Sequence, residues 1–168
     1  MEQKGEDDLI GSSGVEPSEH LASYTGTFEY GVDKAGRISI PPVYREHFKD
    51  LPGYLTLRHG RMALCDGRRW KRFLERSVEW TRNGDGSAGD RGAFDAYLAL
   101  TQEVRVDSQG RFQIPPRFRE HLGIDKAVTV VGLHDHLSIS VPEVAPAADL
   151  DAAVTLLEEL PFGRFLVS

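Results

Sequence analysis

Two arginines stand at matching places in this sequence, and each has the chemistry to bind an anion or the edge of a base. Arg37 and Arg111 both follow a glycine and begin an alternating stretch that is typical of a strand. A guanidinium on such a rigid backbone presents a planar fork of donors that matches a phosphate or the O6/N7 edge of guanine. Alternatively, each arginine pairs with the aspartate of its own turn, Asp33 or Asp107, and only pins a hairpin. The residue chemistry favours recognition of nucleic acid, and both interpretations stay open at this point.

The two arginines belong to a motif that the chain contains twice. Segment 32–48, VDKAGRISIPPVYREHF, returns as segment 106–122, VDSQGRFQIPPRFREHL, at a constant offset of 74 residues. A repeat of this kind indicates one supersecondary unit used two times, so the fold is expected to be a pair of halves. Any function of the repeated loop is then bivalent within a single chain.

The aspartates and glycines of the repeat suit structural roles in the loops. Asp33 and Asp107 can accept N–H groups of their own turns, and their negative charge would oppose a phosphate. Gly36 and Gly110 can adopt a positive φ, which would strain any residue with a Cβ. We therefore assign these four residues to the shape of the loops and not to direct contact with a ligand.

Other cationic side chains give weaker signals. Arg45 and Arg119 fall on the short helices expected after the two Pro-Pro steps, where they could bond helix ends or pair with a neighbouring glutamate. A structural role is favoured for both. A basic helix either contacts phosphates or is a solvated face, and this choice stays open for four residues of segment 67–81: Arg68, Arg69, Lys71 and Arg72.

Hydrophobic periodicity and turn residues predict the elements that position the motif. In the first half we expect strands over 26–32, 37–40, 54–57 and 62–65, a short helix to about residue 49, and a helix over 67–81. A short helix over 92–100 should lead into the second half. That half should have strands over 102–106, 111–114, 127–131 and 137–141 and a helix over 116–122.

These elements define five segments. They are a disordered acidic extension (1–23), a first half (24–82), a linker (83–90), a second half (91–148), and a C-terminal helix with an apolar tail (149–168). The tail should dock on the chain's own core or on a neighbouring subunit. The net charge is −6, yet six acids face one lysine in residues 1–25 and five acids face one arginine in residues 142–168. The body between them is therefore mildly basic, and a local field of this sign can steer an anionic ligand.

The sequence argues against an enzyme. A nucleophile elbow, a P-loop and a dinucleotide fingerprint do not occur in it. His134-Asp135-His136 is the most metal-like cluster, but no third ligand is suitably spaced and a turn between strands explains it better. We expect no metal and no cofactor. The lone Cys65 excludes an intrachain disulfide, no run is long enough to cross a membrane, and residues 1–23 lack a secretory signal, so a cytoplasmic protein is expected.

The doubled Asp-x-x-Gly-Arg-x-x-Ile-Pro-x-x-x-Arg pattern resembles the MraZ family, bacterial transcriptional regulators of the division and cell-wall gene cluster. Tyr24-Thr25-Gly26 stands where that family usually has Phe-x-Gly, and the resemblance covers about residues 24–141. A single copy would indicate only the broader AbrB-like or MazE-like class of swapped hairpins. The chain departs from the family pattern at Ala35, where a lysine is usual, in lacking a tryptophan after the last strand, and in its acidic extension.

The resemblance implies a fold, a partner and an assembly. The fold would be α+β, with two AbrB-type swapped-hairpin halves interlocked into a small pseudo-two-fold β-barrel with flanking helices. The partner would be double-stranded DNA, bound at direct repeats in the promoter of the protein's own operon by a ring-shaped homo-oligomer associated with the nucleoid. Arg37 and Arg111 would contact the DNA, with Lys34 and Arg105 near phosphates. The alternative is an antitoxin-like regulator whose tail also clamps a protein partner.

Overall fold

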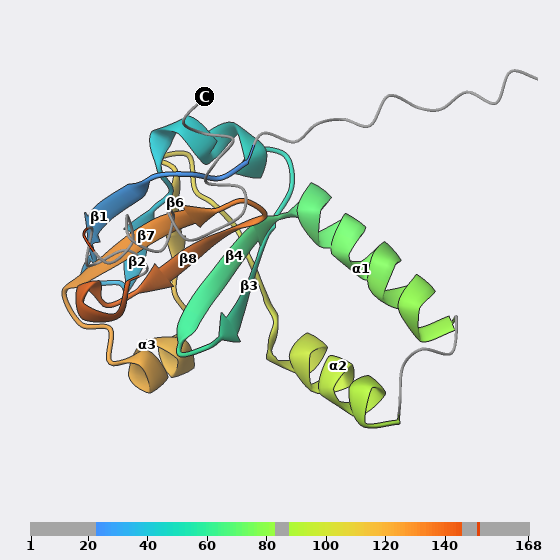
Figure 1. Cartoon of the computed structure of the whole chain (residues 1–168). Coiled ribbons are helices and arrows are strands. Elements are labelled where there is room, and N and C mark those ends of the chain that lie inside the picture. The colour runs from blue at the N-terminus through green and yellow to red at the C-terminus, as the bar shows by residue number, and fades with distance from the viewer. Residues whose placement is uncertain (1–22, 83–87, 146–150, 152–168) are drawn as a thin grey trace, which may run out of the picture.

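The structure, a computed structural model, describes residues 23–82, 88–145 and 151, and it is a mixed α/β fold built on antiparallel strands (Figure 1). The first half contains β1 (Thr27–Gly31), β2 (Arg37–Ser39), the 3-10 helix η1 (Pro42–Phe48), β3 (Gly53–Arg58), β4 (Arg61–Asp66) and α1 (Gly67–Arg82). The second contains α2 (Ala88–Leu100), β5 (Gln102–Val104), β6 (Arg111–Gln113), α3 (Pro116–Leu122), β7 (Ala127–Leu133), β8 (His136–Ser140) and the 3-10 helix η2 (Pro142–Val144). The strands predicted from the sequence are all present, with ends that differ by at most two residues.

The two halves exchange their outer strands in one six-stranded sheet. The strand order is β1-β7-β8-β4-β3-β5, and every neighbouring pair is antiparallel. β1 of the first half pairs with β7 of the second, while β5 of the second half pairs with β3 of the first. The sheet is therefore complete only when both copies of the repeat are present.

The prediction of a closed β-barrel is wrong. In the described part of the chain β1 and β5 are the two edges of the large sheet, and they do not pair with each other. The strands that follow the repeated turns, β2 and β6, form a separate two-stranded sheet instead.

The β2–β6 ribbon lies at the approximate two-fold axis of the molecule and delivers its inner side chains to the core. Ile38 pairs with Phe112, and each is 1% exposed. Beyond the paired strands the ladder continues, because the N–H of Ile40 donates to the carbonyl of Gly110 (2.8 Å) and that of Ile114 donates to the carbonyl of Gly36 (3.0 Å). Each turn is thus bonded to the strand of the other half. Burial of this core holds the ribbon rigidly against the large sheet.

On the opposite face of β3 and β4, α1 and α2 project together to one side of the sheet (Figure 1). Their contacts are aromatic: Trp70 of α1 stacks on Tyr54 of β3 with ring centroids 4.9 Å apart, and Phe73 of α1 meets Tyr97 of α2 at 5.4 Å. Helix α2 begins at Ala88, earlier than the predicted residue 92, so the predicted linker 83–90 is partly helical. Residues 83–87 lie outside the described residues, as do most of the acidic extension and most of the C-terminal helix and tail.

A buried ion pair begins α1. Oδ1 of Asp66 accepts the N–H groups of Arg68 (3.0 Å) and Arg69 (3.1 Å), as an N-cap does. Its Oδ2 accepts the hydroxyl of Tyr24 (2.7 Å) and the guanidinium of Arg69, which also donates to Nδ1 of His47 (3.1 Å). Burial alone would raise the pKa of Asp66, but the bonds from Tyr24 and Arg69 hold it below its ordinary value. This cluster ties the residues before β1 to the start of α1.

Candidate nucleic-acid interface

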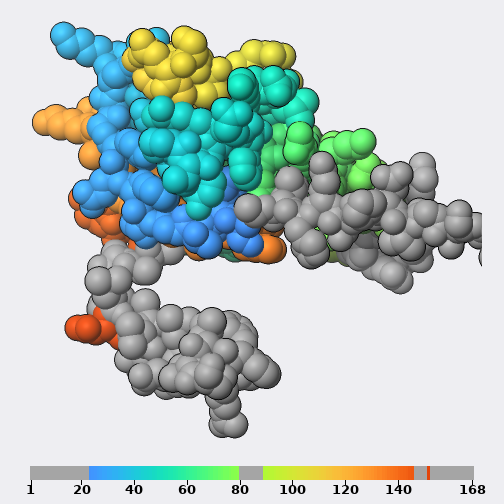
Figure 2. All heavy atoms as spheres, turned by 90° about the horizontal axis from the view of Figure 1, so that it is seen from above, coloured from blue at the N-terminus to red at the C-terminus, as the bar shows by residue number. Residues whose placement is uncertain are grey.

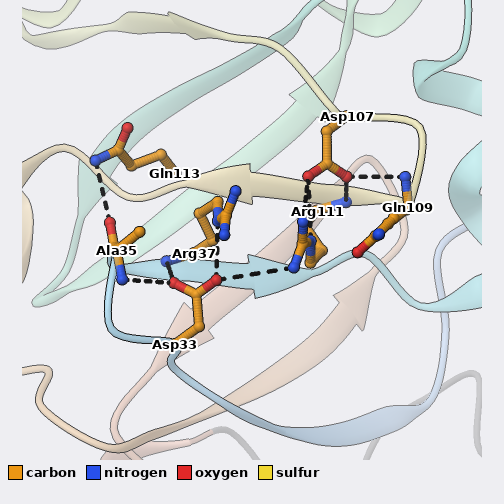
Figure 3. A network of polar contacts seen from close by, with 7 residues as sticks. All are labelled: Asp33, Ala35, Arg37, Asp107, Gln109, Arg111 and Gln113. Carbon is orange, nitrogen blue, oxygen red and sulfur yellow. Dashed lines mark hydrogen bonds and ion pairs between the residues drawn. The ribbon is translucent and has the colours of Figure 1, made fainter.

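Both repeated turns are closed by the same set of hydrogen bonds (Figure 3). The N–H of Gly36 donates to the carbonyl of Asp33 (2.9 Å), and Oδ1 of Asp33 accepts the N–H groups of Ala35 and Arg37, both at 2.9 Å. Asp107 makes the equivalent bonds in the second turn. Gly36 and Gly110 both have φ of +76°, a conformation that residues with a Cβ rarely adopt.

The pKa of both turn aspartates is lowered by the bonds that their carboxylates accept. The pKa of Asp33 lies below its ordinary value, first because its carboxylate accepts the N–H of Arg37 and then because it faces that residue's guanidinium, although partial burial opposes the shift. The pKa of Asp107 is lowered in the same way by Arg111. Each carboxylate therefore fixes its turn and, at the same time, holds one arginine.

The two arginines share one face of the ribbon. In the antiparallel register Arg37 lies opposite Gln113 and Ser39 lies opposite Arg111, so these four side chains leave the face away from the buried pair Ile38 and Phe112. Nε of Arg37 donates to Oδ2 of Asp33 (2.8 Å), while Nε and a terminal nitrogen of Arg111 donate to Oδ2 of Asp107 (3.1 and 3.0 Å). The other terminal nitrogen of Arg111 lies 3.9 Å from Asp33 (Figure 3). The arginines thus bind turn aspartates while 39% of the Arg37 side chain and 29% of the Arg111 side chain stay exposed.

Each turn is also braced by the short helix of the other half. A Cβ on Gly110 would meet the Nε, Cδ and Cζ atoms of Arg45, and a Cβ on Gly36 would meet Arg119. Figure 2 shows the cyan surface of η1 against yellow residues of the second half. The sequence places Arg45 and Arg119 on these helices but does not predict that they cross between the halves. The recurrence of Gly and of Pro-x-x-x-Arg together is the signal that could have suggested it.

The remaining predicted site residues occupy different surroundings. Lys34 is exposed at the tip of the first turn. Arg105 follows the edge strand β5, is 80% exposed, and pairs with Glu103 at 3.0 Å. Across the described residues, no hydrogen bond or ion pair joins Arg105 to either turn. The structure therefore brings Lys34, Arg37 and Arg111 to the ribbon and its turns, and it leaves Arg105 at the sheet edge.

The metal-like cluster of the sequence forms the turn between β7 and β8. His134 has a positive φ of 58°, and its Nδ1 lies 2.7 Å from the hydroxyl of Ser23, whereas Nδ1 of His136 lies 2.6 Å from Asp135. The described residues contain no group of three or more His, Cys, Asp and Glu side chains that could hold a metal ion. Among the helices described, none combines the length and the apolar character needed to cross a membrane.

Comparison with known proteins places this arrangement in a family. A family profile described as "MraZ protein, putative antitoxin-like" matches residues 24–85 and 97–141, the two halves of the fold. The chain belongs to the MraZ family. It is 32% identical to the "Transcriptional regulator MraZ" of Thermomicrobium roseum over 77% of the chain and 90% of that protein. The proteins of the same name from Deinococcus radiodurans and Spiroplasma kunkelii are 30% and 28% identical over 73% and 68% of the chain, covering 84% and 78% of their own lengths.

The resemblance that the doubled motif carries is thus confirmed. Membership of MraZ, a family of transcriptional regulators, also confirms the prediction that the chain is not an enzyme. The tandem halves suit this family, and the open sheet with its separate β2–β6 ribbon departs from the expected barrel.

Proposed function

We propose that this MraZ protein is a DNA-binding transcriptional regulator that inserts the β2–β6 ribbon into the major groove. The observation that carries the proposal is the exposed face of that ribbon, on which Arg37 and Arg111 stand on rigid backbone with their guanidiniums oriented by carboxylates. A major groove admits a two-stranded ribbon, and an arginine fork matches the O6/N7 edge of guanine. The names of the relatives, which call them transcriptional regulators, support the same conclusion.

The finer parts of the proposal concern the target and the assembly. One ribbon presents only a small reading face, so tight binding requires several chains on one DNA. A homo-oligomer, which we propose to be a ring, would raise the effective concentration of ribbons and favour direct repeats in the promoter of the division and cell-wall cluster. Such a protein works in the cytoplasm on the nucleoid. The antitoxin-like alternative relies on a tail that falls outside the described residues.

The test is a titration of the full-length protein with two fluorescent duplexes, one carrying the region upstream of its own gene and one with that sequence scrambled. Arg37→Ala should cost about 1–3 kcal/mol on the specific duplex, because a bidentate arginine–guanine pair carries that much discrimination. The exposed Glu75, on α1, gives a control variant, Glu75→Gln. Unchanged specific binding in the Arg37→Ala/Arg111→Ala double variant would eliminate the ribbon as the reader.

The assembly is tested separately by light scattering coupled to size exclusion. A ring should have a mass several times the 18.7 kDa of one chain. A monomer at micromolar concentration would exclude the ring without excluding DNA binding by a single ribbon.

A further inference from the structure

The approximate two-fold symmetry of the ribbon is broken at its two arginines. Arg111 donates twice to Asp107 and also lies 3.9 Å from Asp33, so two carboxylates neutralise it. Arg37 donates through Nε alone, to Asp33, and no bond within the described residues uses its terminal nitrogens. Arg37 is also the more exposed of the two, at 39% against 29%. The terminal nitrogens of the guanidinium, which would contact a base, are therefore available at the first turn. At the second turn they lie against carboxylates.

Arg45 and Arg119, each of which reaches across to the turn of the other half, break the symmetry in the same direction. Arg45, which lies over the second turn, donates through Nε to the carbonyl of Ile40 (3.2 Å). The equivalent Nε of Arg119, which lies over the first turn, is buried and finds no hydrogen-bond partner among the described residues. Arg119 and Arg45 both lack a carboxylate within ion-pair distance in that part of the chain, and both side chains are partly buried, so the two differ in the unused Nε of Arg119. A positive charge placed this way, with no counter-ion, is suited to an external anion.

The tips of the turns differ as well. The first turn carries the exposed Lys34 where the second carries Ser108. Lys34 and Arg119 belong to different halves, and both flank the turn from which Arg37 projects. Phosphates line the edges of the groove that a ribbon enters, and lysine and arginine are the side chains that neutralise them.

From these three differences we propose that the two turns of one chain have unequal roles on DNA. Arg119, reaching across from the second half, forms with Lys34 a site for a backbone phosphate beside the first turn, and Arg37 is the principal base reader. The second turn, with Arg111 and Arg45 held by internal acceptors, mainly orients the ribbon. This inference rests on the proposed DNA-binding function and extends it by naming a phosphate site and an order between the turns.

The pseudo-symmetric positions supply matched variants for the test. Arg119→Gln and Arg45→Gln remove the same charge from equivalent helices, and Lys34→Gln and Ser108→Gln change the two tips. Each full-length variant is titrated with the upstream duplex and its scrambled version over a range of salt concentrations. Loss of one phosphate contact lowers the slope of log K against log salt by about 0.9. Arg119→Gln and Lys34→Gln should each lower the slope by that amount per engaged chain and weaken both duplexes by a similar factor.

The other variants separate this inference from the function on which it rests. Arg45→Gln and Ser108→Gln should leave the slope unchanged, Arg119→Lys should restore it, and Arg37→Ala should weaken the specific duplex more than Arg111→Ala does. Equal slopes for Arg119→Gln and Arg45→Gln, or equal losses for Arg37→Ala and Arg111→Ala, would overturn the unequal roles while DNA binding by the ribbon stands. If Arg119→Gln fails to assemble, judged by its melting temperature and mass, the surface variant Lys34→Gln decides: an unchanged slope overturns the phosphate site.

Discussion

The contact of Arg119 with the first turn makes a sharp prediction about Gly36. An alanine there must adopt φ of +76°, and its Cβ would lie 3.2 Å from the Cδ and Cζ atoms of Arg119 and closer still to a terminal nitrogen. The left-handed conformation costs about 1–2 kcal/mol for a residue with a Cβ, and forcing a packed side chain aside costs about 1–3 kcal/mol. Gly36→Ala should therefore destabilise the protein by about 2–5 kcal/mol, measured by urea denaturation at a fixed protein concentration.

Gly60 provides the matched control for this measurement. Its φ is +71°, and a Cβ there would meet nothing within 4 Å, so Gly60→Ala incurs the conformational cost alone. Both substitutions restrict the unfolded chain alike. The difference between the two losses of stability, about 1–3 kcal/mol, therefore measures the contact of Arg119 with the first turn. Adding Arg119→Ala to Gly36→Ala should reduce this difference. Equal destabilisation by Gly36→Ala and Gly60→Ala would refute the claim that this guanidinium covers the turn.

Three further predictions concern the first half. Asp66→Ala removes the carboxylate that pairs with the buried Arg69, 8% exposed, and should cost about 3–5 kcal/mol in urea denaturation. Glu75→Ala at an exposed pair should cost under about 1 kcal/mol, and similar costs would contradict the burial argument. Because the folded-state pKa of Asp66 is lowered from 3.8, its contribution is fully present above that value and is lost as pH falls through the folded pKa. Melting temperature should therefore fall less steeply with acid in Asp66→Asn than in the wild type, and parallel curves would disprove this. Burial, followed by the charges of Asp66 and Asp135, raises the pKa of Cys65 to about 12, so iodoacetamide at pH 8 should label it slowly until urea unfolds the chain; rapid labelling of the native protein would count against it.

Local signals in the sequence were sufficient for the strands and turns. The Asp-x-x-Gly step fixes each turn through bonds between neighbours, and the alternation after it predicts β2 and β6. The predicted helix over 67–81 agrees with α1 to within one residue because its apolar stripe and its start after Asp66 are both visible locally. The rigid placement of Arg37 and Arg111 follows from the same patterns.

Long-range choices were not visible in the sequence. Alternation shows which strands have a buried face, but not that β1 pairs with β7 or that β2 and β6 leave the large sheet. A repeat predicts equivalent halves, so it also cannot reveal that Arg111 lies near both aspartates while Arg37 bonds only one. The two copies also carry different residues at equivalent places, such as Lys34 in the first turn and Ser108 in the second.

The exchange of edge strands has a consequence for how the protein is made. A ribosome releases β1 long before β7, its neighbour in the sheet, so the first half leaves the exit tunnel without a complete fold. Closing such a distant pair costs chain entropy that local contacts do not repay, which makes this step slow. Neither turn can be held in place until almost the whole body has been translated, and both then become ordered together.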